Sequence, residues 1–265
     1  MDIAAYTKST LTDHPARLRI LDALRASGEF SISEIQGSMP IPQGTERLLV
    51  FGGDGTMLDA AVRAARSGAA VLGVNLGNLG FLTQFETDAS PEDIAAALIG
   101  GETESRMLLE CRSAAGNFLA LNDVVLRSDG TRPLTVSLFV DGQFADCYRS
   151  DGVIVATPTG STAYSLSAGG PVLAPEVDAV IVNPVCPHTL HSRPIVAGGS
   201  SEIVLRLSSE ESARLVVDGR DEGVLRASSV IAVRRSQTEA RFVKVGENRF
   251  YERLLSKMNR WGTTA

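Results

Sequence analysis

A single carboxylate among three glycines is the first group of residues in this chain that could do chemistry. Gly52-Gly53-Asp54-Gly55-Thr56 follows the apolar run Leu48–Phe51 and precedes a helix-period apolar run that ends at Gly68. A strand, a glycine turn and a helix start direct backbone N–H groups toward an anion such as a phosphate. Asp54 would repel a phosphate, so it indicates metal-linked positioning or acceptance of a proton from an attacking hydroxyl. A tight turn that uses Asp54 as a turn former explains the local pattern equally well.

The glycine motif differs from the two commoner phosphate-binding signatures. It lacks the Lys-Ser/Thr ending of the P-loop and the spacing of G-x-G-x-x-G. After an apolar strand, GGDGT resembles the motif shared by NAD kinases, diacylglycerol and sphingosine kinases, and phosphofructokinases. The rest of the chain must decide among these families.

A second polar segment follows another apolar strand, Gly152–Ala156, and is crowded with hydroxyls and glycines. Hydroxyls and free backbone amides are neutral groups that satisfy phosphate and ribose oxygens, and Tyr164 offers a ring face to a base. By composition alone, a structural loop explains this segment better. The order of the residues in this segment indicates a function more specifically than its composition does. Asp151–Pro171 resembles the DG-IV-TPTGSTAYSLSAGGP signature of NAD kinases nearly residue for residue.

The resemblance to the NAD kinase family covers most of the chain from residue 48 onward. It includes Gly52–Thr56, Asn75–Thr83, Asn122-Asp123, Asp151–Pro171 and Cys186–Pro194. Lipid kinases share the first motif but not the segment Thr162-Ala163-Tyr164 (the TAY segment). The resemblance implies ATP-dependent phosphorylation of the 2′-hydroxyl of the adenosine ribose of NAD, giving NADP.

The resemblance also implies roles for individual residues. Asp54 would accept the proton of the ribose hydroxyl, and Mg²⁺ or another divalent cation would bridge the phosphates of ATP, with no protein residue assigned as a metal ligand. Asp123 stands where the family usually has Glu, and Arg220 where relatives often have Gln or His. The residues assigned to NAD and ATP are Gly52, Gly53, Gly55, Thr56, Asn122, Asp123, Arg149, Asp151, Thr162, Ala163, Tyr164, Ser167 and Arg220.

Composition limits the class of protein. A formal net charge of −6 argues against a nucleic-acid binder. Three cysteines without metal-like spacing favour a reducing cytoplasm. No apolar run is long enough to span a bilayer, and the N-terminus does not resemble a signal peptide. We therefore expect a cytoplasmic protein without nucleic-acid or membrane partners, and the resemblance suggests a homodimer or homotetramer.

The pattern of helices and strands predicted along the sequence indicates two domains and a tail. Residues 1–101 alternate strands and helices, which predicts a Rossmann-like α/β domain with a parallel sheet. One of these helices is predicted to start at Ser90-Pro91, with Ser90 as its N-cap. Residues 102–245 carry alternating β-type runs, including Glu104–Arg112, Phe118–Leu126, Phe242–Val245 and a hairpin at Asp141-Gly142, which predicts a β-sandwich. Residues 246–265 form a tail, helical over Glu247–Asn259, that is expected to pack back on the first domain. Because motifs come from both domains, we expect the catalytic cleft between them.

Two other functions fit the first motif. A lipid kinase would use the same chemistry on a diacylglycerol or sphingoid alcohol, but no amphipathic basic stretch is evident in the chain. A non-catalytic NAD(H) sensor would bind the dinucleotide without transferring a phosphoryl group, and the intact Asp54 argues against it. Incubation with ATP-Mg and either NAD or a lipid separates these possibilities.

Overall fold

Two units make up the fold. The computed structural model describes residues 1–77, 80–130, 132–189, 191–208, 212–246 and 250–263. Unit 1 comprises Met1–Ser105 and Ala240–Ala265, and unit 2 comprises Arg106–Glu239. The chain therefore leaves unit 1 once and returns to it near its C-terminal end.

Unit 1 is built on a six-stranded sheet in the order β2-β1-β3-β4-β18-β5. The pairings of β1 with β2, β1 with β3, β3 with β4 and β4 with β18 are parallel, as the strand-helix rhythm predicts. The strands are β1 (Asp2–Thr7), β2 (Ser31–Gln36), β3 (Arg47–Phe51), β4 (Ala70–Val74), β5 (Thr103–Arg106) and β18 (Ala240–Val243). The helices are η1 (Ser9–Leu11), α1 (Pro15–Ala26), α2 (Asp54–Ser67), α3 (Pro91–Gly100) and α5 (Phe250–Thr263).

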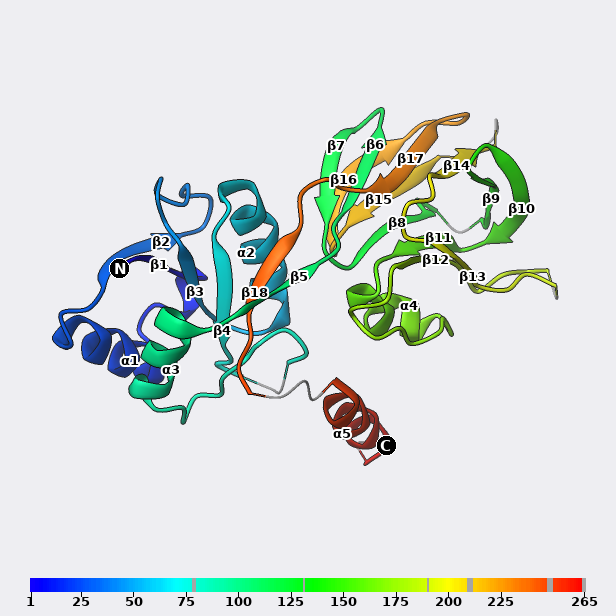
Figure 1. The fold of residues 1–265 in the computed structure, drawn as a ribbon. Helices are drawn as coiled ribbons and strands as arrows, with labels where there is room; N and C mark the ends of the chain where they lie inside the picture. The colour runs from blue at the N-terminus through cyan, green and yellow to red at the C-terminus, as the bar shows by residue number, and fades with distance from the viewer. Residues whose placement is uncertain (78–79, 131, 190, 209–211, 247–249, 264–265) are drawn as a thin grey trace. The chain divides into compact units, whose positions relative to one another are not determined.

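Helices cover both faces of this sheet, so its central strands are almost continuously apolar. One face packs Leu49, Leu72 and their neighbours against α1 and α3. The other face meets α2, because a Cβ at Gly73 of β4 would lie 2.6 Å from the sulfur of Met57. Figure 1 shows α2 on one side of the sheet and α1 and α3 on the other. The helix start predicted at Ser90-Pro91 is confirmed, since the Ser90 hydroxyl accepts a hydrogen bond from the Asp93 amide at 3.0 Å.

Unit 2 is a β-sandwich of two six-stranded antiparallel sheets, as predicted. The sheet orders are β10-β9-β14-β17-β6-β7 and β13-β12-β11-β8-β15-β16. The first sheet contains β6 (Leu109–Ser113), β7 (Gly116–Ala120), β9 (Leu134–Val140), β10 (Gln143–Ser150), β14 (Ile203–Leu207) and β17 (Val230–Arg235). The second contains β8 (Asp123–Ser128), β11 (Gly152–Ala156), β12 (Ala179–Val185), β13 (Ile195–Gly198), β15 (Ala213–Val217) and β16 (Arg220–Leu225). Two short helical turns, η2 (Thr159–Thr162) and α4 (Tyr164–Ser167), follow β11.

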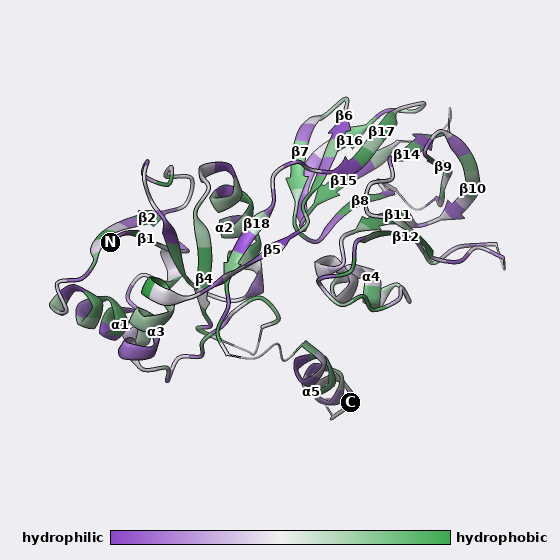
Figure 2. Ribbon diagram, viewed as in Figure 1, coloured by the Kyte–Doolittle hydropathy of each residue, from purple (hydrophilic) through white to green (hydrophobic). Residues whose placement is uncertain are grey.

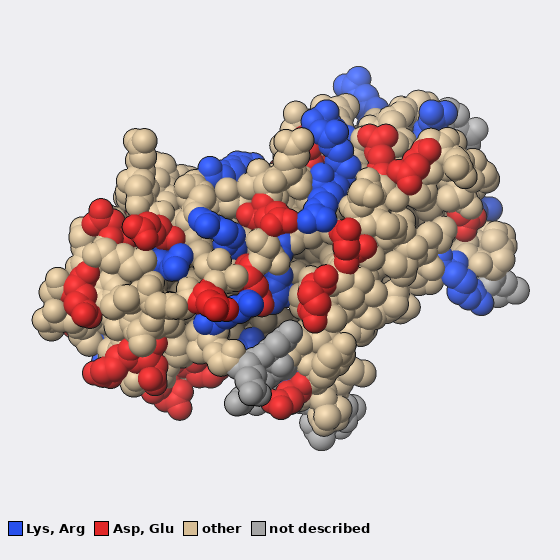
Figure 3. All heavy atoms as spheres, in the orientation of Figure 1, with Lys and Arg blue, Asp and Glu red and all other residues tan. Residues whose placement is uncertain are grey.

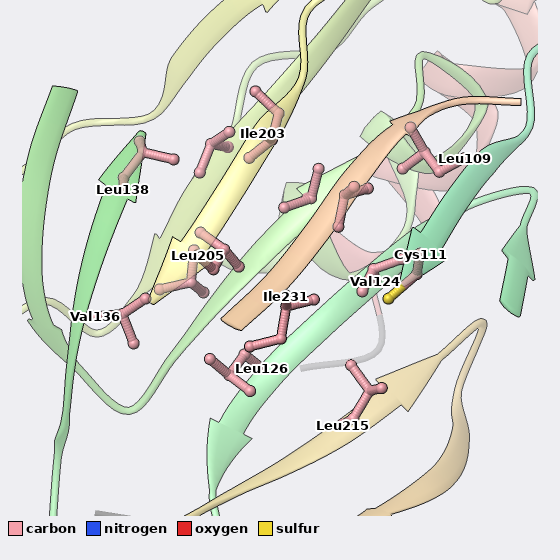
Figure 4. Packing of buried hydrophobic residues seen from close by; sticks show 14 of the residues in the cluster. Leu109, Cys111, Val124, Leu126, Val136, Leu138, Ile203, Leu205, Leu215 and Ile231 are labelled. Carbon is pink, nitrogen blue, oxygen red and sulfur yellow. The ribbon is translucent and has the colours of Figure 1, made fainter. Parts of the chain in front are cut away.

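The core of unit 2 lies between its two sheets. Buried and partly exposed residues alternate along strands such as β9, whose Leu134, Val136 and Leu138 belong to the core. Hydrophilic and hydrophobic residues are mixed along the strands of this unit (Figure 2). Leu205 and Ile231 from one sheet point toward Val124 and Leu126 from the other (Figure 4). The hairpin predicted at Asp141-Gly142 joins β9 to β10, with positive φ angles of 50° and 78° at these two residues.

Three predicted strands are arranged differently in the structure. The run 118–126 is divided between β7 and β8, and the run 104–112 is divided between β5 of unit 1 and β6 of unit 2. The strand predicted at 242–245 for the β-domain is β18, which pairs with β4 in the sheet of unit 1. The tail helix predicted over 247–259 is α5, and residues 247–249 lie outside the described part of the chain.

Two further observations concern the distribution of charge and the hydropathy of the helices. On the face drawn in Figure 3, acidic and basic side chains are interspersed. Within the described ranges, no helix is both long and apolar enough to cross a bilayer.

Candidate active site

The glycine motif forms the turn from β3 into α2. The Gly52 amide donates to the carbonyl of Val74 at 3.0 Å, and its φ of 154° is strained for a residue with a side chain. A Cβ at Gly52 would lie 2.5 Å from the hydroxyl oxygen of Thr56, so the turn needs glycine there. Asp54 is the first residue of α2, where its negative charge meets the positive end of the helix. The turn lies at the carboxyl end of β3, next to β1, where the strand order of the sheet reverses and open α/β sheets bind ligands.

The carboxylate of Asp54 is held by three donors from distant parts of unit 1. The amide of Leu82 donates to Oδ1 and the amide of Phe81 donates to Oδ2, each at 3.0 Å. The Lys257 ammonium lies 3.2 Å from Oδ2. These donors are 27, 28 and 203 residues away in sequence, so the carboxylate does more than form a strand-to-helix turn.

Gly80 allows the loop after β4 to close on Asp54. A Cβ at Gly80 would lie 2.3 Å from Asp54 Oδ1. The loop is anchored at its start by Asn75, which is fully buried and donates from its side chain to Glu86 at 2.8 Å. Residues 78 and 79 of the predicted Asn75–Thr83 motif lie outside the described part of the chain.

In unit 2, the carboxylate of Asp218 organises the start of β8. It accepts hydrogen bonds from the amides of Leu121 at 2.8 Å, Asn122 at 2.8 Å and Asp123 at 3.1 Å. Asp218 itself lies in the β15–β16 hairpin with a φ of 47°, and its amide donates to the carbonyl of Asp123 at 3.0 Å. The predicted Asn122-Asp123 pair is therefore fixed through its backbone.

The Asp123 side chain is buried beside Asp218, with the whole residue only 5% exposed. Burial, and to a smaller extent the negative charge of Asp218, raise the pKa of Asp123 to about 7. Burial also raises the pKa of Asp218, although the three amides and the charge of Arg220 oppose this effect. With a pKa of about 7, the Asp123 carboxyl group is partly protonated near neutral pH.

The hydroxyl-rich segment after β11 packs directly against Asn122. The Thr157 hydroxyl donates to the carbonyl of Leu121 at 2.5 Å, and the Thr157 amide donates to the carbonyl of Asn122 at 2.9 Å. A Cβ at Gly160 would lie 2.0 Å from the carbonyl oxygen of Asn122. The structure therefore brings the segment after β11 into contact with Asn122.

The predicted residues of η2 and α4 differ in accessibility. Thr162 is buried, Ala163 is half-buried, Tyr164 is 43% exposed and Ser167 is exposed. The exposed ring of Tyr164 is thus available to a base. The side-chain amide of Asn183, in β12, donates to the carbonyl of Ser165 at 3.0 Å and supports the segment.

The predicted charged residues at the end of β10 are exposed to solvent. The His188 amide donates to the carbonyl of Arg149 at 2.8 Å, and the His188 ring lies 3.8 Å from the carboxylate of Asp151. Arg220 is also exposed, at the start of β16. The side chains of Arg149 and Arg220 are accessible to an anionic ligand. The side chain of Asp151 is accessible to a polar ligand.

The sequence matches two related domain families. Residues 29–102 match the ATP-NAD kinase N-terminal domain, and residues 121–245 match the ATP-NAD kinase C-terminal domain. An NAD kinase from Moorella thermoacetica is 37% identical over 270 residues, covering 99% of this chain and 85% of that protein. The chain belongs to the NAD kinase family.

Other members of the NAD kinase family agree in sequence and fold. An NAD kinase from Ectopseudomonas mendocina is 41% identical over 82% of this chain and 76% of its own length. The fold is similar to that of yeast NADH kinase complexed with NADH, with a TM-score of 0.87, 26% identity, and coverage of 98% of this chain and 88% of that one. It is also similar to an NAD kinase from Archaeoglobus fulgidus in complex with ATP, with a TM-score of 0.82, 29% identity, and coverage of 98% and 99%.

Reasoning from NAD kinase motifs missed several residues that hold the site. Asp218 directly precedes Gly219, and this Asp-Gly pair is a hairpin signal that places Asp218 at a turn. Lys257 and Arg253 lie on α5, and the pattern there indicated only a helix. Their i, i+4 spacing on one helix face was the available signal.

The described residues include no group of three or more His, Cys, Asp or Glu side chains arranged to hold a metal ion. A cation held largely by the phosphates of a nucleotide would need only one or two protein carboxylates, because Mg²⁺ keeps several waters.

Proposed function

We propose that this member of the NAD kinase family transfers a phosphoryl group from ATP to the 2′-hydroxyl of the adenosine ribose of NAD, with Asp54 as the proton acceptor. The hydroxyl oxygen forms a bond to the γ-phosphorus, the bond from that phosphorus to the bridging oxygen breaks, and ADP leaves. The hydroxyl proton passes to Asp54. Phosphoryl transfer depends mainly on positioning and on stabilisation of charge.

The observation that carries this proposal is the hydrogen bonding of Asp54. A carboxylate has about four acceptor positions. Oδ2 accepts from Phe81 and Lys257, whereas among the described residues Oδ1 accepts only from Leu82. One position on Oδ1 is thus open to a hydroxyl, and the carboxylate is oriented before the substrate arrives.

The remaining predicted residues fit the two nucleotides. In the proposal, the glycine turn, Gly52, Gly53, Gly55 and Thr56, faces the donor phosphates at the start of α2. NAD is bound by Asn122, Asp123, Thr162, Ala163, Tyr164 and Ser167. The polar groups of NAD that remain exposed are contacted by Arg149, Asp151 and Arg220. Mg²⁺ would be held by the donor phosphates and would supply charge neutralisation there.

The direct experiment measures NADP formation from NAD and ATP-Mg, with Asp54→Asn as the test variant. We expect kcat to fall by roughly 100-fold or more with the fold and most of the NAD affinity retained. Asp88→Asn, at an exposed acid of the same unit, should behave like the parent protein. Unchanged turnover in Asp54→Asn would remove Asp54 from the chemistry. NAD binding without NADP formation by the parent protein would instead favour the NAD(H) sensor.

We also propose that the protein acts in the cytoplasm as a homodimer or homotetramer. The compartment is supported by three free cysteines, of which Cys147 and Cys186 are exposed. Light scattering on the purified protein measures its oligomeric state, and a monomeric mass at working concentration would contradict the assembly.

A further inference from the structure

The tail helix α5 supplies a cation to the glycine motif. Lys257 is one of only three lysines in the chain, and its ammonium lies 3.2 Å from Asp54 Oδ2. The same ammonium lies 3.9 Å from the centroid of the Phe81 ring. The side chain is 15% exposed, so the charge is largely withdrawn from solvent.

A second residue of α5 holds the loop that carries the two amide donors. The Arg253 guanidinium donates to the carbonyl of Thr83 at 3.0 Å and to that of Phe81 at 3.4 Å. Arg253 and Lys257 are four residues apart, so they project from the same face of the helix. Arg253 therefore fixes the backbone of residues 81–83, and Lys257 fixes the carboxylate that this backbone binds.

We propose that Lys257 is a positioning residue for Asp54, and that α5 is needed for turnover because it presents this lysine. The proposal rests on the role of Asp54 in the proposed function. Lys257 and the Phe81 amide together fill the acceptor positions of Oδ2. The carboxylate therefore offers its remaining position, on Oδ1, to the hydroxyl, and it does not rotate between several hydrogen-bonded arrangements.

The contacts separate this role from that of a general phosphate-binding lysine. A lysine that serves phosphates is a point charge with hydrated donors free to follow the ligand. Lys257 instead lies between a carboxylate and an aromatic ring, both of which stabilise it where it is. We expect its loss to affect the chemical step more than the binding of either nucleotide.

The first test compares Lys257→Met, Lys257→Arg and the parent protein in steady-state NADP formation. Lys257→Met should lower kcat by roughly 10- to 100-fold, the effect of losing a charge-assisted hydrogen bond that orients a reacting group. The KM values for NAD and ATP should change by less than about threefold. Lys257→Arg should recover most of the turnover, because it keeps the charge. Lys8→Met, at an exposed lysine of the same unit, is the matched control and should leave kcat unchanged.

The second test is a double-mutant cycle with Asp54→Asn. Because Lys257 acts through Asp54, Asp54→Asn with Lys257→Met should be no slower than Asp54→Asn alone. Fully additive losses, or a Lys257→Met effect confined to the KM for ATP, would show that Lys257 acts on another group and would overturn the proposal. Unchanged kcat in Lys257→Met, or unfolding of both Lys257 variants by circular dichroism, would overturn it as well. Normal turnover of Asp54→Asn alone would instead refute the proposed function.

Discussion

The buried Asp123 should make the stability of unit 2 depend on pH. Its folded-state pKa of about 7 lies above the value of about 3.9 of an unfolded aspartate. Between these values the folded protein binds more protons than the unfolded chain, so stability falls as pH rises from about 4 to about 7. Three units at about 1.36 kcal/mol each give a loss of up to about 4 kcal/mol above pH 7.

Asp123→Asn removes this titration while keeping the shape of the side chain. We expect the variant to match the parent protein near pH 4 and to be more stable by up to about 4 kcal/mol at pH 8. For a unit of this size that corresponds to a rise in Tm of up to roughly 15 °C. Scanning calorimetry across this pH range measures the difference directly.

The control for this experiment is Glu176→Gln, at an exposed acid of unit 2, which should follow the parent protein at every pH. Parallel pH profiles for the parent protein and Asp123→Asn would refute the reasoning. They would mean that Asp123 is ionised in the folded protein at little cost, with a partner that the contacts described above do not include.

Two glycine substitutions test the close approaches in the two units. Gly80→Ala places a Cβ 2.3 Å from Asp54 Oδ1, so kcat should fall by roughly 10-fold or more in the NADP assay. Gly77→Ala should leave kcat unchanged, because apart from its chain neighbours no described residue has an atom within 4 Å of the new Cβ. Equal kcat values would show that the loop tolerates the shift. Gly160→Ala places a Cβ 2.0 Å from the Asn122 carbonyl, so calorimetry should show a loss of about 1–3 kcal/mol and titration should show weaker NAD binding. Gly198→Ala, whose Cβ would have an ordinary contact at 3.7 Å, is its control, and matching values for the two would contradict the proposed packing.

Local signals predicted much of the fold because they act between near neighbours. The Ser90 cap, the Asp141-Gly142 hairpin and the buried strands β3 and β4 follow from side-chain chemistry within a few residues. The run 118–126 is two strands because Asp218, about a hundred residues later, binds the three amides at the break. A local apolar pattern does not contain that contact.

In the candidate site, too, local sequence signals predict some residues, whereas contacts between residues far apart in the chain determine others. The local pattern marks Asp54 and the glycines around it as candidates, and the resemblance to NAD kinases adds the segment Thr162–Ser167. The groups that orient Asp54 were not predicted, because Lys257 lies 203 residues away and its helix pattern indicates only packing. The same holds for β18, whose apolar residues fit either sheet until its pairing with β4 is known.

The central claim is that Asp54 accepts the proton of the NAD ribose hydroxyl, and a single-turnover assay tests it most directly. Parent protein and Asp54→Asn, each in excess over NAD, are mixed with ATP-Mg and quenched, and NADP is measured over time. The account predicts that the rate constant for NADP formation falls by roughly 100-fold or more in Asp54→Asn while bound NAD stays comparable. Equal rate constants for the two proteins would contradict it.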